Sequence, residues 1–357
     1  MQAEYGDCFI LELKSGDNSV NVLIDGGPYR TFEKHLKPAL QKLLLNGRLD
    51  LMVLSHIDND HIIGLLDLLE EIRKQRESGT KEMIEIEEIW NNSFTDLLKS
   101  DEDPQILLGQ IFRTLNFENR KEFSESLLVK GFQQGTDLVK LAKLLEIPLN
   151  SDFDELIVVN DKIKSFHLNN MVFHLLGPTK DNVDKLRKEW KSWIERKTSE
   201  TMLGLVQNLD KSIPNLASIS FMVQTNNKKI LFTGDSLGQD IVDVLTINKM
   251  LDRNGKFYVD VLKIPHHGSD RNTSLEFFNI IHAEYYIISA NGRDDNPSID
   301  TLGWIIETGN TSKEPKKIVL TNMTPNVEKI LHEYDQKKYN YEAMVLKKES
   351  HFITIEL

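Results

Sequence analysis

The sequence predicts an α/β protein in which two β-sheets pack face to face between outer layers of helices, a four-layer α/β/β/α sandwich with a helical insertion. Short apolar runs that end in turn residues recur in both halves of the chain, and segments of helical spacing separate them. The run at 51–54 is apolar at every position, as strands are when both of their faces are covered. Strands followed by helices in each half predict that each half supplies one sheet.

The individual elements follow from the same two patterns. Apolar runs that end in turn signals or polar loops predict strands at 8–13, 21–24, 51–54, 84–90, 156–159, 172–176, 218–224, 229–233, 258–264, 285–289 and 317–321, and a closing hairpin at 344–357. Apolar residues at helical spacing predict helices at 32–45, 62–73 and 181–196.

Residues 94–153 differ from the segments on either side. Helical patterns dominate there, at 105–115, 123–130 and 136–145, and strand runs are absent. We therefore expect one domain whose first half (1–93) and second half (154–357) are interrupted by a helical insertion. The insertion is either a cap over an active site or a docking surface for a protein partner, and the sequence does not choose between them.

The bulk properties narrow the class of protein. Of the 357 residues, 40% are hydrophobic and 27% charged, and no apolar run approaches the roughly 20 residues of a membrane span, so no membrane partner is expected. The first residues carry Glu4 and Asp7 where an export signal has basic residues, which makes a cytoplasmic location the default. Because Cys8 is the only cysteine, neither an intrachain disulfide nor a thiolate-rich metal site is possible.

The net charge of −12 argues against a protein that coats duplex nucleic acid through a basic surface. It does not exclude a nuclease, since bound divalent cations and a few local basic residues can hold a phosphodiester.

A dense group of possible metal ligands follows the strand expected at 51–54. His56, Asp58, Asp60 and His61 fall within six residues, on a loop between this strand and a helix. Alternate positions of an extended loop point the same way, so the first three side chains can converge, and His61 can turn in as the helix begins. Asp60 would also serve as a helix cap, but a cap alone does not account for two carboxylates and two histidines.

Two later strand ends carry further candidates. The strand at 229–233 ends in Gly234-Asp235, and the strand at 258–264 ends in Pro265-His266-His267-Gly268-Ser269. Each signal is weak alone, because an aspartate after a strand is usually a turn residue.

Together these motifs resemble the metallo-β-lactamase superfamily. The order Asp25, then the 56–61 loop, then Asp235, then the histidine pair, each after a strand, matches that family. The Pro-His-His-Gly-Ser block, Thr-Gly-Asp at 233–235 and Tyr-Gly-Asp at 5–7 resemble the hydrolase domain of bacterial competence DNA-uptake channel proteins (ComEC-like). The resemblance covers about 1–92 and 155–300. The inserted helices resemble those of stand-alone members found beside antiphage defence genes.

The resemblance implies two divalent metal ions, zinc or manganese. His56 and Asp58 would serve the first ion, Asp60 and His61 the second, and Asp235 would bridge them.

The resemblance assigns further roles around this pair. Asp25 would orient the ligand loop. Of the histidine pair, His266 is favoured as the ligand that completes the second site, because it comes first off the strand, and His267 is left for substrate or proton transfer. Asp60 would orient the attacking water or take its proton.

The sequence departs from the family pattern in three places. Asp58 stands where a histidine is usual, and the segment 214–218 has Asn215 but no histidine for the first metal ion. After Ser289 the sequence reads Asn291-Gly292 and then Asn296-Pro297, so a histidine usual in the branch is missing there too. The first site is therefore richer in oxygen ligands, with one histidine, two carboxylates and Asn215 as a candidate ligand or supporting residue. This favours manganese or magnesium and makes weak binding an expectation there.

The resemblance favours hydrolysis of phosphodiesters, in a nucleic acid or a nucleotide, by a metal-activated hydroxide, with a role as an effector of antiphage defence. Groups near the ligand loops are expected to hold the substrate; they are Lys263, Ser269, Arg271, Asn291 and Asn296. The alternative is a catalytically degenerate or partner-activated subunit of the same fold, suggested by the altered ligands and the insertion.

Overall fold

The computed structural model describes residues 1–15, 18–92, 97, 127–153, 156–160, 162–169, 171–198, 214–225, 227–308 and 314–357. The helix expected at 105–115 lies outside the described residues, as does the first part of the one expected at 123–130.

The first sheet comes from the N-terminal part of the chain. Its strands lie in the order β1 (Phe9–Ser15), β2 (Asn18–Ile24), β4 (Leu51–Val53) and β6 (Ile89–Trp90). β1 and β2 form an antiparallel hairpin, β4 pairs in parallel with β2, and β6 pairs in parallel with β4. A small separate sheet pairs β3 (Arg48–Leu49) with β5 (Glu85–Ile86).

The second sheet has eight strands and contains both pairing modes. Its order is β14 (Tyr341–Val345), β13 (Lys316–Leu320), β12 (Ile281–Ile288), β11 (Phe257–Lys263), β10 (Lys228–Phe232), β9 (Ser220–Thr225), β8 (Met171–Gly177) and β7 (Ser165–Leu168). β7 to β10 pair antiparallel, and β10 to β14 pair parallel. The closing hairpin expected at 344–357 was therefore wrong: the segment contributes the end of one parallel edge strand, and its remainder forms no strand.

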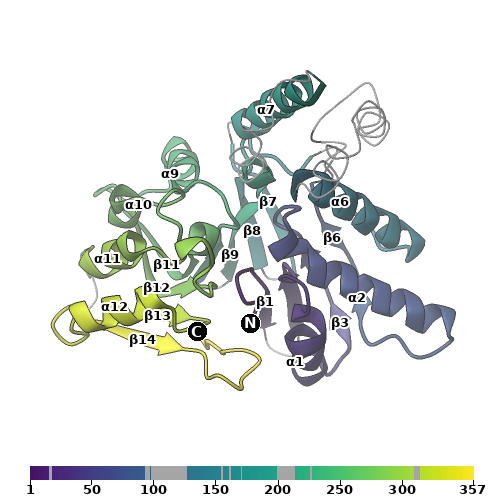
Figure 1. Ribbon diagram of the computed structural model, residues 1–357, viewed down its shortest axis with the longest axis horizontal. Coiled ribbons are helices and arrows are strands. Elements are labelled where there is room, and N and C mark those ends of the chain that lie inside the picture. Colours follow the sequence, from purple (N-terminus) through teal and green to yellow (C-terminus); the bar gives the residue numbers. More distant parts are fainter. Residues whose placement is uncertain are drawn as a thin grey trace.

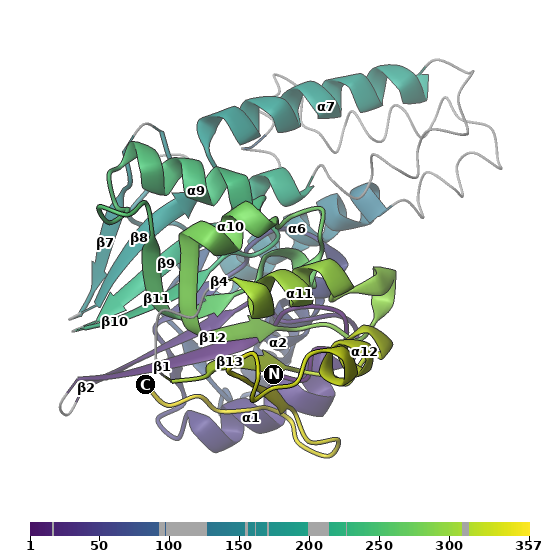
Figure 2. The same ribbon diagram turned by 90° about the vertical axis from the view of Figure 1, so that its left-hand side faces the viewer.

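Helices cover the outer face of each sheet, which gives the four layers predicted from the sequence (Figure 1). On the first sheet lie η1 (Phe32–Leu36), α1 (Lys37–Leu43), α2 (Asn59–Glu77) and α6 (Leu127–Leu144). On the second sheet lie α9 (Gly238–Ile247), α10 (Leu275–Ile280), α11 (Ile299–Glu307) and α12 (Pro325–Glu333). α7 (Lys180–Thr198) lies at one end of the molecule, and its buried apolar residues belong to the core on the first sheet's helical side (Figure 2).

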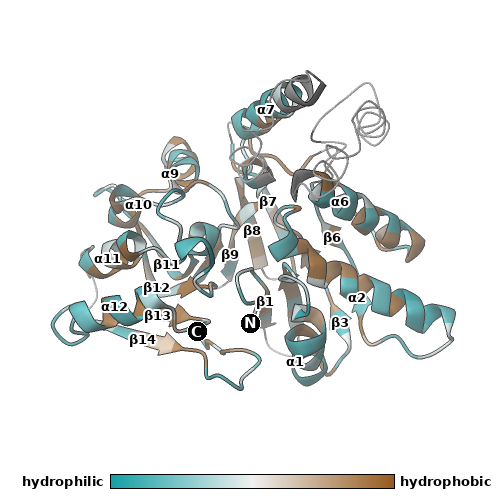
Figure 3. Ribbon diagram, viewed as in Figure 1, coloured by the Kyte–Doolittle hydropathy of each residue, from teal (hydrophilic) through white to brown (hydrophobic). Residues whose placement is uncertain are grey.

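Alternation along the strands explains why two cores form. In β2, Val22 and Ile24 face the second sheet, whereas Leu23 faces the helices. Successive side chains of a strand point to opposite faces, so one apolar strand serves both cores. The α/β sandwich is thus confirmed, and the outer helices α2 and α6 mix apolar and polar residues as this packing requires (Figure 3).

Among the described residues, no helix combines the length and the apolar character that crossing a bilayer needs.

Candidate metal centre

The candidate ligands gather where the carboxyl ends of strands from both sheets meet. Asp25 follows β2 and the 56–61 loop follows β4 in the first sheet, while Asp235 follows β10 and His267 follows β11 in the second. Loops at the carboxyl ends of strands are where open α/β sheets hold their sites. The sandwich therefore brings together residues that are more than 200 positions apart.

Asp25 and Ser55 hold the ligand loop from behind. The Asp25 carboxylate accepts hydrogen bonds from the Ser55 backbone N–H (2.7 Å) and hydroxyl (2.7 Å), and its Oδ2 lies 2.9 Å from Nδ1 of His61. Both residues and His61 are buried. Because Nδ1 of His61 is engaged by a carboxylate, the ring presents Nε2 to the centre of the site. Asp25 thus contacts the ligand loop through both Ser55 and His61.

His56 is oriented in the same way by hydroxyl groups. Its Nδ1 lies 3.1 Å from the Ser55 hydroxyl and 3.5 Å from that of Ser218, and its Nε2 lies 3.7 Å from both Asp58 Oδ2 and Asp235 Oδ2. The His56 side chain is buried, whereas Asp58 is 25% exposed. Asp58 therefore faces the mouth of the site.

His267, more than His266, joins the ligands of the 56–61 loop. Nε2 of His267 lies 3.3 Å from Asp60 Oδ2, and Asp60, His61 and His267 form one group whose ligand atoms lie within 4.8 Å of one another. Nδ1 of His267 donates to the carbonyl of Ser289 at 2.9 Å. His266 is 29% exposed and belongs to no such group among the described residues, although its Nε2 lies 3.6 Å from Asp235 Oδ2.

Asp235 is the common neighbour of all these histidines. Its Oδ2 lies 3.5 Å from Nε2 of His61 and 3.6 Å from Nε2 of His267, in addition to the contacts with His56 and His266. Its carboxylate is 2% exposed. One carboxylate oxygen surrounded by imidazole nitrogens has the placement expected of a ligand shared by two cations.

The donor atoms fit divalent cations. Nε2 of His56, His61 and His267 and Oδ1 of Asp235 are buried and have no hydrogen-bond partner. Unsatisfied buried polar atoms are costly and rare, so several of them converging on one point call for a ligand. Imidazole and carboxylate are the ligand types that zinc and manganese accept.

The electrostatics of the metal-free site agree with this reading. Burial alone lowers the pKa of His267, but the carboxylates of Asp235, Asp7 and Asp60 outweigh it and raise this pKa to about 10. The pKa of His61 is also raised well above its ordinary value by Asp235 and Asp25, against the effect of burial. Burial raises the pKa of Asp235, but the surrounding histidines hold it well below its ordinary value. Without cations, protons on histidines balance the carboxylates.

The histidine loop has a strained backbone. His266 (φ 45°) and His267 (φ 56°) both adopt the left-handed region, followed by Gly268 (φ 85°). Left-handed conformations of residues other than glycine occur where the surroundings enforce them, often at functional sites. Here His266 N–H donates to Gly234 O, and Ser298 N–H donates to Gly268 O. This double turn puts both rings in the site from adjacent positions.

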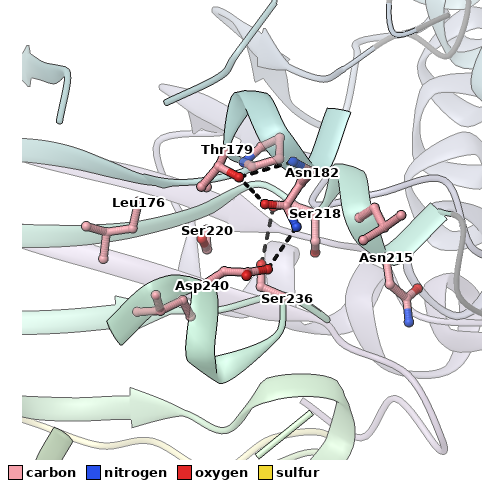
Figure 4. A pocket seen from close by; sticks show the side chains of 12 residues that line it. Leu176, Thr179, Asn182, Asn215, Ser218, Ser220, Ser236 and Asp240 are labelled. Atoms are coloured by element: carbon pink, nitrogen blue, oxygen red, sulfur yellow. Dashed lines mark hydrogen bonds between the residues drawn. The ribbon is translucent and has the colours of Figure 1, made fainter. Parts of the chain in front are cut away.

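Asn215 does not join the ligands. It lies in η2 (Pro214–Ala217), and its buried Oδ1 has no hydrogen-bond partner. With Ser218, Ser220, Ser236 and Asp240 it lines a polar pocket that adjoins the site through Ser218 (Figure 4). The position that lacks the family's third histidine is therefore occupied by serine hydroxyls, and the Ser218 hydroxyl accepts from Asp235 N–H at 2.9 Å.

The expected substrate groups differ in exposure. Arg271 is exposed beside the histidine loop, while Ser269 is buried, with its hydroxyl accepting from Arg271 N–H at 3.3 Å. Asn291 donates to Glu4 (3.2 Å), and Asn296 is buried with its N–H bonded to Arg293 O.

Lys263, also expected at the substrate, is 1% exposed beneath the site. Its ammonium forms an ion pair with Asp7 and donates to Gly234 O. These contacts leave the ammonium directed into the protein and away from a substrate phosphate.

Sequence reasoning missed three participants. Asp7, Ser55 and Ser218 all contact candidate ligands, yet none was assigned a role. The Tyr-Gly-Asp motif at 5–7 was visible as part of the resemblance and could have pointed to Asp7. The two serines carry no signal of their own, because serine is common beside turns.

Comparison with known proteins agrees with this geometry for the N-terminal part. Residues 2–137 match the model of the metallo-beta-lactamase superfamily. The match includes the 56–61 loop and ends before Asp235 and His267. Among solved structures, the metallo-beta-lactamase fold protein YhfI from Bacillus subtilis aligns over 97% of this chain and 94% of that chain, with 12% identity and a TM-score of 0.39. No curated protein matches the chain. The family-model match supports the superfamily resemblance over residues 2–137, and the ComEC-like branch stays a prediction.

Proposed function

We propose that the protein is a hydrolase of the metallo-β-lactamase superfamily that binds two divalent metal ions and cleaves phosphodiesters. The observation that carries the proposal is the convergence of the buried Nε2 atoms of His56, His61 and His267 on Asp235, which they approach to 3.5–3.7 Å without a hydrogen bond. A structural histidine cluster would satisfy these nitrogens with protein groups.

The geometry supports a particular division of the ligands. His56, Asp58 and Asp235 would hold one ion, and Asp60, His61, His267 and Asp235 the other. We thereby replace the earlier preference for His266 with His267.

The charge of the site supports two ions. One buried lysine, Lys263, offsets one of the five carboxylates in and behind the cluster, which leaves four negative charges, equal in size to the charge of two divalent cations. Those carboxylates are Asp7, Asp25, Asp58, Asp60 and Asp235.

Two bound divalent ions would supply Lewis-acid activation of water and of a phosphoryl oxygen. The protein would contribute orientation and proton transfer. His266 is suited to protonate a leaving oxygen, because it is partly exposed at the mouth and its Nδ1 lies 2.8 Å from Asn272 Oδ1. Asn272 in turn donates to the backbone carbonyl of Asp235 (2.9 Å), so this ring is fixed relative to the ligands.

The substrate class is supported by the groups around the mouth. Arg271 is exposed next to the histidine loop, and the half-exposed Arg293 stacks on Tyr5, 4.1 Å from the ring centroid. Guanidinium groups bind phosphate oxygens in a planar fork, and an aromatic ring can stack on a base. The proposed substrate is therefore a nucleotide-containing phosphodiester, in a nucleic acid or a smaller molecule.

The test is cleavage by the Mn²⁺-loaded protein of single- and double-stranded DNA, RNA and bis(p-nitrophenyl) phosphate. Asp60→Ala/His61→Ala should abolish cleavage, and His332→Ala, an exposed position on α12, should not. Cleavage that persists at the wild-type rate in the double variant would place the activity elsewhere. Metal binding without cleavage of any phosphodiester would refute the substrate class.

A contact of the insertion favours a second candidate, a hydrolase controlled by a partner bound to residues 94–153. A Cβ at Gly131 or at Gly135 of α6 would lie 3.0 Å from atoms of Ile57. Since Ile57 stands between His56 and Asp58, movement of α6 would shift both.

Gly131→Leu tests this coupling, with Lys143→Leu on the exposed side of the same helix as its control. The first variant should lower Mn²⁺ affinity at the His56–Asp58 site, and the control should not. Equal affinity in both variants would remove the support for this candidate.

A further inference from the structure

A buried ion pair lies directly behind the candidate ligands. Lys263 and Asp7 are each 1% exposed, and the Lys263 ammonium pairs with Asp7 Oδ2. The same ammonium donates to Gly234 O at 2.7 Å and lies 3.6 Å from Oδ1 of Asp235. Burying two charges often costs as much as their attraction returns, so such a pair is weak evidence for stability. Its contacts with Asp235 and His267 point instead to a role at the candidate ligands.

Lys263 acts on the rotation of the Asp235 carboxylate. Oδ1 of Asp235 faces the ammonium, and Oδ2 faces the imidazole nitrogens of His61 and His267 at 3.5 and 3.6 Å. A positive charge on one side of the carboxylate keeps one oxygen there and leaves the other for the site.

Asp7 acts on the ring of His267. Its Oδ1 lies 3.4 Å from Nδ1 of His267, which also donates to Ser289 O. Because a carboxylate and a carbonyl both lie beside Nδ1, the proton is held on Nδ1 and Nε2 is the nitrogen free for a cation. The Ser289 hydroxyl donates to Gly6 O at 2.5 Å, which joins this carbonyl to the segment that carries Asp7.

The N-terminal segment is also fitted to Asp60. A Cβ at Gly6 would lie 2.0 Å from Asp60 O, and Asp7 N–H donates to this carbonyl at 3.1 Å. Residues 6 and 7 thus contact the backbone of one candidate ligand and the side chain of another.

We propose that Asp7 and Lys263 are a positioning pair that fixes His267 and Asp235 for metal binding, without binding metal or substrate themselves. This inference rests on the proposed function, since it assigns the pair to the same two-ion site. It predicts that altering Asp7 weakens metal binding while the fold is retained.

The experiment is a calorimetric titration of the metal-free full-length protein with Mn²⁺, which measures the affinity of each site. Asp50→Asn is the matched control for Asp7→Asn. Asp50 is also a buried aspartate in an ion pair with a basic residue, Arg48, and it lies outside the groups of candidate metal ligands. We expect Asp7→Asn to weaken one of the two sites by about 10- to 100-fold. Asp50→Asn should keep wild-type affinities.

A spectroscopic measurement separates positioning from general loosening. With Co²⁺ in place of Mn²⁺, the visible spectrum should change in Asp7→Asn and not in Asp50→Asn, because the geometry around the ion changes only in the former. If Asp7→Asn does not fold, Asp7→Glu keeps the charge and displaces the carboxylate, and it should show the same loss of affinity.

The outcomes distinguish this inference from the function on which it rests. Wild-type Mn²⁺ affinities in Asp7→Asn, or in Asp7→Glu where the amide does not fold, would overturn the positioning pair and leave the two-ion hydrolase intact. Equal losses in the Asp7 variant and the Asp50 control would overturn it as well. A wild-type protein that binds no Mn²⁺ would refute both.

Discussion

Gly64 of α2 should tolerate no side chain, because the helix lies directly on the loop that carries Asp25. A Cβ at Gly64 would lie 1.9 Å from Gly26 O and 2.7 Å from Gly26 C. The two segments are also joined by Gly26 N–H to His61 O (2.7 Å) and Gly64 N–H to Gly27 O (3.1 Å). Gly64→Ala must therefore displace the carbonyl of Gly26, which follows Asp25 in the chain and is hydrogen-bonded to His61 through its N–H.

The expected free-energy change combines opposing effects. Alanine is favoured over glycine inside a helix by about 1 kcal/mol. Forcing a methyl group into a packed interface costs about 1–3 kcal/mol. Weakening the two backbone hydrogen bonds costs about 1 kcal/mol each. Gly64→Ala should therefore destabilise the protein by about 2–4 kcal/mol.

Urea unfolding of the metal-free protein, followed by circular dichroism, measures this change. Gly303→Ala is the matched control, since this buried helical glycine of α11 would place its Cβ no closer than 3.7 Å to Tyr334 Oη. The control should be stabilised by up to about 1 kcal/mol. If Gly64→Ala is as stable as the control, the close packing of α2 on the 25–27 loop is refuted.

Three further predictions follow from the site. Because the pKa of His267 is raised to about 10 in the metal-free protein, Mn²⁺ binding should release a proton from this ring at pH 7, and Mn²⁺ affinity should rise with pH. Calorimetry in buffers of different ionisation enthalpy should show the proton release, and heats that do not depend on the buffer would contradict it. Adding Mn²⁺ at 100 times its Kd to chelator-treated protein should stabilise the fold by about 2.7 kcal/mol per site, visible as a higher Tm; an unchanged Tm would count against cation binding. Arg293→Ala should raise KM severalfold for a dinucleotide and much less for bis(p-nitrophenyl) phosphate, because the proposed function assigns the guanidinium that stacks on Tyr5 to nucleotide binding. Equal effects on both substrates would remove this proposed role.

The layered fold was predictable because burial determines the sequence pattern. The apolar run at 51–54 becomes β4 and the helical spacing after it becomes α2, since strands covered on both faces and helices covered on one leave different periodicities. The segment at 344–357 misled us because apolar-rich runs at 344–346 and 352–357 flank a polar stretch, as in a hairpin, whereas β14 pairs in parallel with β13. The strand expected at 156–159 was wrong, since the segment forms only an isolated bridge between Val159 and Thr179.

The ligand loop was predictable from spacing, but the supporting residues were not. Four ligand-type residues in six positions are a local signal, while Asp7 and Lys263 meet only through the tertiary fold, 256 positions apart. Which of His266 and His267 reaches the ligands depends on their consecutive left-handed backbone conformations. Residues other than glycine rarely adopt this conformation, so the sequence gives no sign of it.

The contact between the insertion and the ligand loop was equally invisible in the sequence. Gly131 and Gly135 weaken a helix when considered alone, and only the position of Ile57 against α6 explains them.

Anomalous diffraction from crystals grown with Mn²⁺ tests the central claim most directly. The account predicts two peaks, one beside Asp60, His61 and His267 and the other beside His56 and Asp58, with Asp235 in contact with both. Peaks confined to other parts of the surface, with none beside Asp235, would contradict it.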